Sequence, residues 1–428
     1  MIEKALQQRH LDNNPIRVAI VGAGATSRMI VHQLLTPIVG MRLVAIANRT
    51  IENAERAFMS AGADSPERVS SLAHLEETIS RGRYVATDNA MLVTLASNVD
   101  VIVEATGTIE FGAGVVMSAI ENRKHVILVN AELDSTIGPI LKRYADAAGV
   151  VISNTDGDEP GVAMTLLRYL RGVGFKPVAA GNLKGLIDPY RTPETQKAFA
   201  EKYSQNAAKV TSFADGTKLS MEATILANAT GFRVGKRGMY GPRCSHVKEI
   251  AGRLPIDQLL TGGLVDYALG AEPHTGAFVV VHEEDQKKRL DLNYYKMGNG
   301  PLYVFYTPYH LPHVQLISSI ARAALFGDAT VAPDASPVCD VAAFAKRDLI
   351  AGDIIDGVGG YMAYGMIENY DITSRDQLLP MGLSEGCRLK ADVRKDAPIT
   401  FNDVLLPDNR LCDRLRAEQD SVFATRKG

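Results

Sequence analysis

The sequence has few cysteines, no surplus of positive charge and no long apolar run. Its four cysteines form no Cys-x-x-Cys pair and are too sparse for a disulfide framework, so free thiols in a reducing compartment are expected. The formal net charge of −3 excludes a basic field that would attract nucleic acid or an anionic membrane. The longest apolar runs are strand-sized, and residues 1–14 contain no apolar signal-peptide stretch. We therefore expect a cytoplasmic protein without nucleic-acid or membrane partners.

The chain has instead the length and composition of a multidomain globular protein. Its 428 residues, 46% of them hydrophobic and 22% charged, exceed what one hydrophobic core holds. Changes in sequence texture predict three domains, at residues 1–155, 156–330 and 338–415. A proline-rich stretch at 331–337, VAPDASP, separates the last two and is typical of a linker.

In the first domain, short β-branched runs alternate with helix-like segments. The runs are IRVAIVG, MRLVAIAN, VDVIVEA, HVILVN and GVVIS, with a further short strand expected near 84–87. Continuous valine and isoleucine runs, without alternation of apolar and polar residues, are typical of strands covered on both faces. This pattern predicts a doubly wound parallel α/β sheet.

Beyond residue 156 the texture is that of an α+β domain. Longer and more mixed strands are expected at 217–230, 276–284 and 301–310, in an antiparallel sheet. A helix is expected at 312–326, since a proline stands in its first turn and a glycine follows its end. The last domain reads as a small glycine-rich β segment followed by a charged helix near 408–420.

A glycine motif follows the first predicted strand and opens a helix, in the sequence Gly22-Ala23-Gly24-Ala25-Thr26-Ser27. Gly22 permits a tight turn and Gly24 lets the backbone approach a pyrophosphate. Ala25 and Thr26 begin the helix whose N–H groups would bind that pyrophosphate. A lone motif of this kind is weak, but its place at the first of several alternating strands favours a Rossmann dinucleotide-binding domain.

The end of the second predicted strand bears on the choice of cofactor. Enzymes that use NAD usually have an acid there, whereas this chain has Asn48-Arg49-Thr50 and no carboxylate before Glu52. Arg49 suits a 2′-phosphate, so NADP(H) is expected, with NAD as the alternative if Arg49 only stacks on the adenine. Thr106 and Gly107 follow the next strong strand and are expected to form the wall beside the nicotinamide half.

The order of Gly-x-Gly, EATG, HVILVNAELDSTIGP and DGDEPG resembles homoserine-dehydrogenase-like oxidoreductases with a C-terminal SAF domain, including deoxyxylulose-phosphate-reductoisomerase-like enzymes. The resemblance runs from about residue 16 to 415. Its most specific pieces are ANATG, GMYGPR, VDYALG, TPYHL and, in the SAF part, FAKRDLIAGDII. It implies a Rossmann domain, a central catalytic domain that forms homodimers, and a small β-rich SAF domain. Such enzymes reduce or isomerise small substrates with NADPH.

The resemblance also implies site residues. Lys184 aligns with a substrate-site lysine, and Arg243, Tyr309 and His310 match substrate-binding positions. Asn182 stands where reductoisomerase-like members have a second lysine, so one phosphate-binding charge is missing. From the residues themselves, Lys184 would stabilise an oxyanion, or else be a solvated surface lysine. Arg243 would grip a carboxylate or phosphate, or else form a structural ion pair.

Four further side chains leave two interpretations each. Asp158 and Glu159 would supply a general base or substrate contact, or would only cap the helix that follows them. The i, i+3 spacing of His310 and His313 suggests a metal site, but no thiol lies nearby and no metal is expected. His310 is interpreted as a catalytic or structural histidine. Tyr309 would contact substrate or pack in the core.

Together these features predict an NAD(P)H-dependent oxidoreductase that acts on the carbonyl or alcohol of a small anionic substrate, sugar-like or amino-acid-like. One alternative is a reductoisomerase acting on 1-deoxy-D-xylulose 5-phosphate or a related keto-sugar. An alternative of another class is a non-catalytic NADP-binding sensor that uses the SAF domain to bind a partner. Residues 338–405 are not expected to take part in hydride transfer.

Overall fold

The computed structural model describes residues 1–424, which form two compact units, each with its own sheet. The first unit contains residues 1–134, 140–158 and 311–332. The second contains residues 135–139, 159–310 and the chain from 333 onward. No helix within residues 1–424 is both long and apolar enough to cross a membrane.

The first unit is built on a seven-stranded sheet in the order β3-β4-β2-β1-β5-β6-β7, and every pairing in it is parallel. The order runs outward from β1 in both directions, so the predicted doubly wound α/β fold is confirmed. All the strands expected from the valine- and isoleucine-rich runs are present, and the two-residue β3 was not predicted. The strands are β1 (Ile16–Val21), β2 (Met41–Ala47), β3 (Glu67–Arg68), β4 (Val85–Thr87), β5 (Val101–Glu104), β6 (His125–Leu128) and β7 (Ile152–Asn154).

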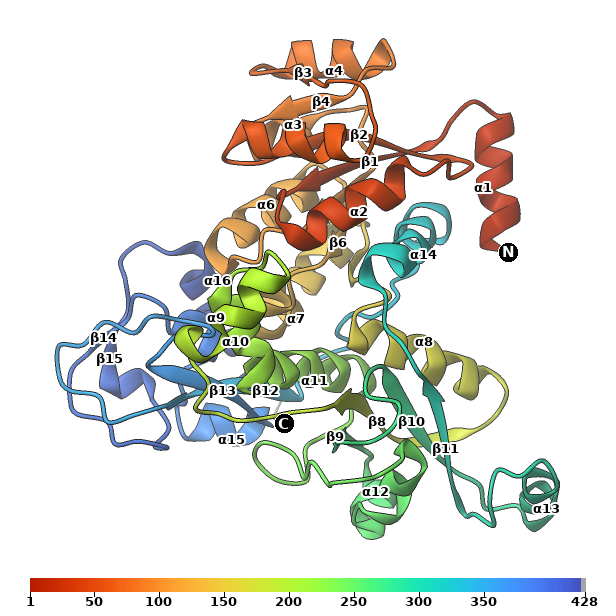
Figure 1. Ribbon diagram of the computed structural model, residues 1–428, viewed down its shortest axis with the longest axis vertical. Coiled ribbons are helices and arrows are strands. Elements are labelled where there is room, and N and C mark those ends of the chain that lie inside the picture. The colour runs from red at the N-terminus through yellow and green to blue at the C-terminus, as the bar shows by residue number, and fades with distance from the viewer. Residues whose placement is uncertain (425–428) are drawn as a thin grey trace. The chain divides into compact units, whose positions relative to one another are not determined.

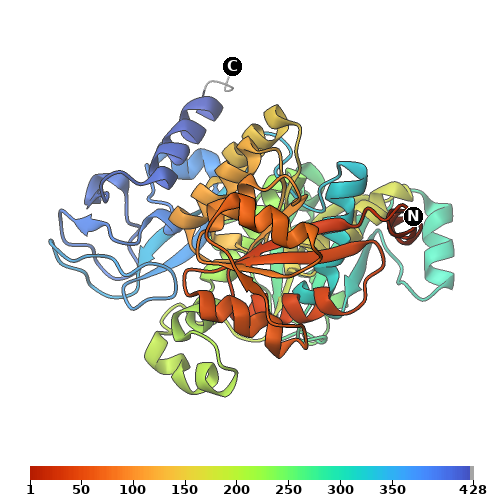
Figure 2. The same cartoon turned by 90° about the horizontal axis from the view of Figure 1, so that it is seen from above.

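Helices lie on both sides of the strands of this unit (Figure 2). Helix α14 (Pro312–Phe326) occupies the predicted range, with Pro312 in its first turn and Gly327 in the left-handed region at its end. It joins the first unit across a long stretch of sequence and packs its apolar side chains into the same core as those of α2. The other helices are α1 (Ile2–Leu11), α2 (Ala25–Leu35), α3 (Ile51–Ser60), α4 (Leu72–Ser80), α5 (Ala90–Leu95), α6 (Ile109–Glu121) and α7 (Ala131–Ala148), the last crossing into the second unit.

The second unit contains a four-stranded sheet in the order β11-β10-β8-β9 (Figure 1). Strands β8 (Lys176–Lys184) and β9 (Leu264–Leu269) are parallel, whereas β10 (Ala277–His282) pairs antiparallel with β8 and with β11 (Leu302–Thr307). One face carries α8 (Glu159–Gly172) and α11 (Thr217–Thr230), and the other is covered by η1 (Val247–Gly252) and α12 (Ile256–Thr261). The α+β character expected after residue 156 is therefore present. The expected antiparallel sheet is wrong in one pairing, because β8 and β9 are parallel and the sheet is mixed.

The strand expected at 217–230 is wrong, because this segment is helix α11. Residues 217–229 are all buried, so the helix has no solvent face. Its sequence therefore lacks the apolar residues at every third or fourth position, with polar residues between them, that mark an amphipathic helix. Alanine and leucine, which favour a helix, supply five of its 14 residues, and Gly231 ends it in the left-handed conformation. The strands expected at 276–284 and 301–310 are confirmed as β10 and β11.

Strands β8 and β9 approach each other so closely that one position admits only glycine. A Cβ atom on Gly181 would lie 1.6 Å from the carbonyl oxygen of Asp266, its partner in the register. This contact fixes the register that brings Asn182 opposite Tyr267 and Lys184 opposite Leu269. The candidate site at the end of β8 depends on that register.

The chain after residue 333 packs on α11 and contains most of the remaining short elements. The side-chain oxygen of Asn228 accepts hydrogen bonds from the N–H groups of Val338 and Cys339, which anchors the start of β12 (Cys339–Ala345) to α11. The four cysteines of the chain are buried, and none of them forms a disulfide. The elements of this unit not yet named are α9 (Pro193–Lys202), α10 (Ala207–Ala214), α13 (Gln286–Tyr294), β13 (Ala363–Asn369), α15 (Tyr370–Arg375), η2 (Met381–Leu383), β14 (Arg388–Leu389), η3 (Phe401–Asp403), β15 (Val404–Leu405) and α16 (Leu411–Ala424).

Candidate functional site

The glycine loop between β1 and α2 has the geometry that a dinucleotide requires. Gly22 has φ of +111°, and a Cβ atom there would lie 2.7 Å from the carbonyl oxygen of Ala105, so only glycine fits. Nothing lies within 4 Å of the position where Gly24 would carry a Cβ atom. No side chain caps the N-terminus of α2 at Ala25 and Thr26, which leaves its first N–H groups available to an anion.

The ends of β2 and β5 frame this loop. The side-chain oxygen of Asn48 accepts a hydrogen bond from the N–H of Ala23 at 3.1 Å, and its amide donates to the carbonyl of Thr50. Arg49 is exposed, and within residues 1–424 its side chain makes no hydrogen bond or ion pair. Gly107 is exposed in the left-handed region, with nothing within 4 Å of its missing Cβ atom, and Thr106 is held by the carboxyl of Glu104. The predicted cofactor residues therefore lie at the carboxyl edge of one sheet.

A second cluster of polar residues lies in the other unit, at the end of β8. The ammonium of Lys184 lies 2.5 Å from Oε1 of Glu159 in the first turn of α8, and 3.3 Å from Oε2 of Glu222 on α11. The side chains of Glu159 and Glu222 are only 6% and 3% exposed, and that of Lys184 is 18% exposed. Lys184 is therefore no solvated surface lysine. It is a nearly buried cation held between two carboxylates from the two helices that cover one face of the sheet.

The charges in this cluster stabilise one another. Burial opposes the charged form of Lys184, but the charges of Glu159 and then Glu222 outweigh it and raise the pKa of the ammonium. Burial likewise opposes ionisation of Glu159, but Lys184 and then His310 outweigh it and hold the pKa of this carboxyl well below its usual range. Lys218 adds a second cation 3.9 Å from Glu222. Lys184 and Glu159 are therefore both charged at neutral pH.

Asn182 lies two residues before Lys184 on the same face of β8. Its side-chain nitrogen donates to Oε2 of Glu222 at 2.9 Å. A carboxylate only accepts hydrogen bonds, so the amide must present its nitrogen to Glu222 and its oxygen elsewhere. That oxygen is buried and has no hydrogen-bond partner within the described residues. An orphaned acceptor beside a buried cation is a place where a ligand with a hydrogen-bond donor fits.

The segment after β11 reaches the same end of the sheet. Nδ1 of His310 lies 3.9 Å from Oε2 of Glu159, and this nitrogen is buried without a hydrogen-bond partner in the described part of the chain. Tyr309 is half exposed, so it does not pack in the core. His310 therefore offers a second unsatisfied polar group to the cluster around Lys184.

Arg243 lies on the neighbouring strand edge. It forms an isolated parallel bridge to Leu269, which pairs with Lys184 in the β8–β9 register. Its side chain is exposed and makes no hydrogen bond or ion pair within residues 1–424, so it is no structural ion pair. Burial and the charge of Asp266 raise the pKa of the Tyr267 phenol, and the positive charge of Arg243 opposes this rise. The backbone of Arg243 is thus separated from that of Lys184 by strand β9 alone.

One more predicted residue, Asp158, and two residues that were not predicted, Glu222 and Lys218, lie at or near this cluster. Asp158 is buried and immediately precedes α8, at the position expected of a helix cap. Glu222 and Lys218 were missed because their segment was interpreted as a strand. On a helix, their i, i+4 spacing puts them on one face, so a correct assignment of α11 would have revealed the pair.

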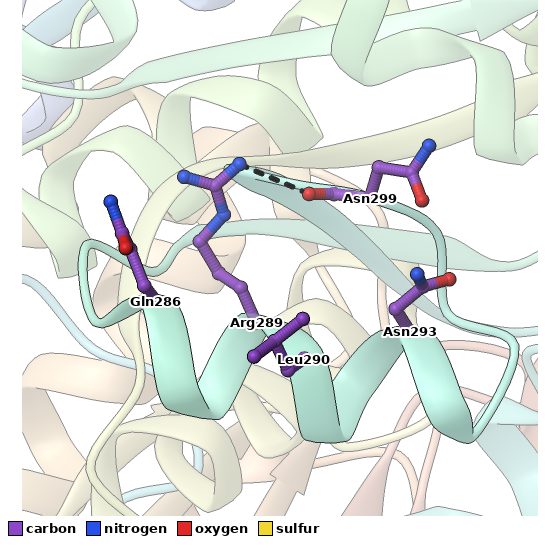
Figure 3. Close-up of a pocket in the computed structure, with 5 residues that line it drawn as sticks. All are labelled: Gln286, Arg289, Leu290, Asn293 and Asn299. Atoms are coloured by element: carbon purple, nitrogen blue, oxygen red, sulfur yellow. Dashed lines mark hydrogen bonds between the residues drawn. The ribbon is translucent and has the colours of Figure 1, made fainter.

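A cavity elsewhere in the second unit lacks this chemistry. It measures about 340 Å³ and lies along α13, between β10 and β11 in the sequence. Figure 3 shows Arg289 reaching across it to donate to the carbonyl of Asn299, at 3.1 Å. No residue of α13 is buried, and Arg289 is the one titratable side chain in the lining, which otherwise consists of Gln286, Leu290, Asn293 and Asn299. This cavity is not the candidate site.

Comparison with known proteins agrees with the location of the cluster. Residues 157–316, less than half of the chain, match the family described as Oxidoreductase DRL, catalytic domain. This span contains every residue of the cluster around Lys184, including Glu222 and Arg243. No curated protein matches the chain.

Several solved structures match parts or most of the chain at low identity and with TM-scores below 0.5. An NAD binding oxidoreductase from Klebsiella pneumoniae is 18% identical over 42% of this chain, and the match spans 45% of its own length (TM-score 0.29). A DOX-P reductoisomerase in complex with NADPH, fosmidomycin and magnesium is 14% identical over 50% of this chain and 57% of its own (TM-score 0.33). A homoserine dehydrogenase from Thiobacillus denitrificans is 14% identical over 90% of this chain and 97% of its own (TM-score 0.45). The chain thus spans about half the length of the first two.

Proposed function

We propose that the protein is an NADP-dependent oxidoreductase that interconverts a carbonyl and an alcohol on a small anionic substrate. The observation that carries this proposal is the cluster at the end of β8, where Lys184 is held as a buried cation between Glu159 and Glu222. A fixed, desolvated cation is what a reaction needs when negative charge develops on an oxygen. The match of residues 157–316 to an oxidoreductase catalytic domain supports the same assignment.

The glycine loop of the first unit fits a nicotinamide dinucleotide. Gly22 and Gly24 give the backbone access to a pyrophosphate, and the uncapped N–H groups of Ala25 and Thr26 would bind it. Arg49 would take the 2′-phosphate, since its guanidinium is exposed and has no partner in the described residues. Such a cofactor supplies or accepts a hydride when bound.

The second unit would bind the substrate and stabilise charge on it. Lys184 would donate to the reacting oxygen, and its two carboxylate partners keep it charged and oriented. His310 would hold or deliver a proton, because its Nδ1 is buried and unpartnered beside Glu159. Arg243 would bind the anionic end through its planar pair of N–H donors.

The orphaned oxygen of Asn182 narrows the substrate class. It can only accept, so a ligand that satisfies it must bring a hydroxyl or an ammonium group. A lysine in its place would have offered another cation to a phosphate. We therefore favour a hydroxylated or amino-bearing carbonyl compound, sugar-like or amino-acid-like, over a simple ketone.

The test is turnover. Purified protein should oxidise NADPH, followed as a fall in absorbance at 340 nm, with at least one compound from a panel of hydroxy- and amino-carbonyl acids and keto-sugar phosphates. Formation of a rearranged carbon skeleton from 1-deoxy-D-xylulose 5-phosphate would identify a reductoisomerase. Tight NADPH binding with no turnover on any compound would favour a sensor and contradict the proposal.

Cofactor preference provides a prediction for Arg49. NADPH should bind at least several-fold tighter than NADH, because the exposed guanidinium neutralises the 2′-phosphate. Arg49→Asp should reverse the preference, since the new carboxylate repels that phosphate and accepts from a 2′-hydroxyl. Titration can follow the emission of the bound dihydronicotinamide. Equal affinities of the wild type for the two cofactors would contradict the role of Arg49.

Arg243 is expected to act on binding more than on rate. Its bonds to the anionic end of a substrate are made equally in the ground state and the transition state, so Arg243→Met should raise KM more than it lowers kcat. Steady-state kinetics on the substrate found in the panel measures this, and Arg253→Met, at an exposed ion pair in the same unit, is the control. A fall in kcat at unchanged KM would mean that Arg243 touches the reacting oxygen instead.

A further inference from the structure

A buried carboxyl in the first unit has a polar atom that nothing in the described chain satisfies. Glu104 ends β5 and is fully buried. Its Oε1 accepts from the N–H of Thr106 at 3.0 Å and from the hydroxyl of Thr106. Its Oε2 is buried without a hydrogen-bond partner within residues 1–424. Burying an ionised carboxylate oxygen without a hydrogen-bond partner costs free energy of folding.

The carboxyl of Glu104 organises the turn at 105–108. Asn130 donates at 2.9 Å to the carbonyl of Thr108, and Thr106 and Thr108 share a hydrogen bond between their hydroxyls at 3.1 Å. Gly22 of the dinucleotide loop packs directly against Ala105 in the same turn. The position of this turn, and of the loop that rests on it, therefore depends on Glu104.

The surroundings favour the uncharged form of this carboxyl. Burial raises the pKa of Glu104 to about 7, although the hydrogen bonds from Thr106 act in the opposite direction. The charge of Glu132, on α7, raises the pKa of Glu104 further. The residues paired with Glu104 on the neighbouring strands β1 and β6 are the apolar Val21 and Leu128. Helix α6 faces it with Gly112, whose missing Cβ atom would lie 3.4 Å from the carboxyl carbon. No cation from these elements compensates an ionised Glu104.

We propose that Glu104 is a positioning residue of the cofactor site, whose uncharged carboxyl holds the 105–108 turn in place and whose ionisation weakens cofactor binding. The proposal rests on the proposed function, because it takes that turn as the wall of the nicotinamide half. The proton belongs on Oε2, since Oε1 accepts all the hydrogen bonds. When this proton leaves, an uncompensated charge appears beneath the turn, and the turn must shift or admit water to solvate it.

The test is the pH dependence of NADPH and NADH affinity between pH 6 and 9, for the wild type and Glu104→Gln. Glutamine keeps the acceptor for Thr106 and places a neutral amide where Oε2 lies. Since only the uncharged form binds well, the wild-type Kd should rise above pH 7, by at most about tenfold per pH unit. The Kd of Glu104→Gln should stay flat over the same range. Titration with NADH, which lacks the 2′-phosphate, removes any contribution from ionisation of that group.

Two further variants separate positioning from mere structure. Glu132→Gln removes a negative charge that raises the pKa of Glu104. In this variant the rise of Kd with pH should therefore keep its slope and begin at a lower pH than in the wild type. Glu104→Ala deletes the acceptor and should weaken binding at every pH. If Glu104→Gln and the wild type have parallel pH profiles, the proposal is wrong. If the wild type binds neither cofactor at pH 6.5, the proposed function fails. Hydrogen exchange of the amides of residues 105–108 still tests whether Glu104 orders the turn. Faster exchange in Glu104→Ala supports the positioning role, and unchanged exchange contradicts it.

Discussion

Replacing Lys184 by methionine is expected to reduce turnover by about 10²–10³-fold while leaving NADPH affinity unchanged, because an oxyanion donor of this kind is typically worth about 3–4 kcal/mol. The cofactor residues lie on the sheet of the other unit, so they do not depend on the lysine. Methionine preserves the apolar stem and removes only the charge. Steady-state kinetics and cofactor titration on the same preparation measure the two effects.

The same variant should also be less stable, in a manner that depends on pH. Removing one partner of a buried ion pair costs about 3–5 kcal/mol, since Glu159 and Glu222 would then be buried without Lys184. In the wild type the lowered pKa of Glu159 stabilises the fold above the ordinary pKa of a glutamate, and this contribution is lost as the pH falls through the folded value. In the variant, burial instead raises the pKa of that carboxyl, so stability is lost as the pH rises. The difference between the two proteins should therefore be largest near neutral pH and smallest near pH 4.

Lys176 provides the matched control, since it begins the same strand and is exposed. Lys176→Met should change neither turnover nor the urea midpoint by a measurable amount. If Lys184→Met keeps more than about half of wild-type turnover, the oxyanion role passes to His310 or Tyr309. Wild-type activity combined with a lower stability would leave Lys184 as a structural cation only.

The sequence was sufficient for the fold of the first unit because its signals are local. Strands covered on both faces are apolar runs without alternation of apolar and polar residues. Gly22 predicts a tight turn, because no other residue fits at that position. The helix at 312–326 was marked at both ends by Pro312 and Gly327. Helix α11 had no such marks: every residue of its first 13 positions is buried, so the apolar periodicity that distinguishes a helix from a strand was absent.

The candidate site was partly within reach of the sequence for a related reason. Lys184 and Glu159 were identified by resemblance and by residue type, but their 2.5 Å contact joins the end of a strand to the start of the preceding helix, and no residue pattern predicts that contact. Glu222 was missed together with its helix. The orphaned oxygen of Asn182 and the uncompensated Glu104 have no sequence signature, since each is defined by what surrounds it in three dimensions.

Lys346→Met is expected to destabilise the second unit by about 3–5 kcal/mol without affecting NADPH binding. The ammonium of Lys346 donates at 2.8 Å to Asp215 and, also at 2.8 Å, to the carbonyls of Arg191 and Gly360, and the two charged side chains are almost fully buried. Burial raises the pKa of Asp215 and Lys346 opposes this, so without the lysine the pKa of the carboxyl rises further. The loss of stability should therefore grow as the pH rises toward neutrality.

The neighbouring Arg347 offers the comparison that decides whether this buried pair joins the chain after residue 333 to the rest of the second unit. Its side chain is exposed and lies 4.0 Å from Asp353, so Arg347→Met should cost less than about 1 kcal/mol. The double variant Lys346→Met with Asp215→Leu should recover part of the loss, because it leaves no unpaired charge. Urea unfolding at pH 5 and pH 7 measures all three. Equal midpoints for Lys346→Met and Arg347→Met would show that the buried pair contributes nothing, whereas a drop in NADPH affinity would mean that this part of the chain influences the cofactor site.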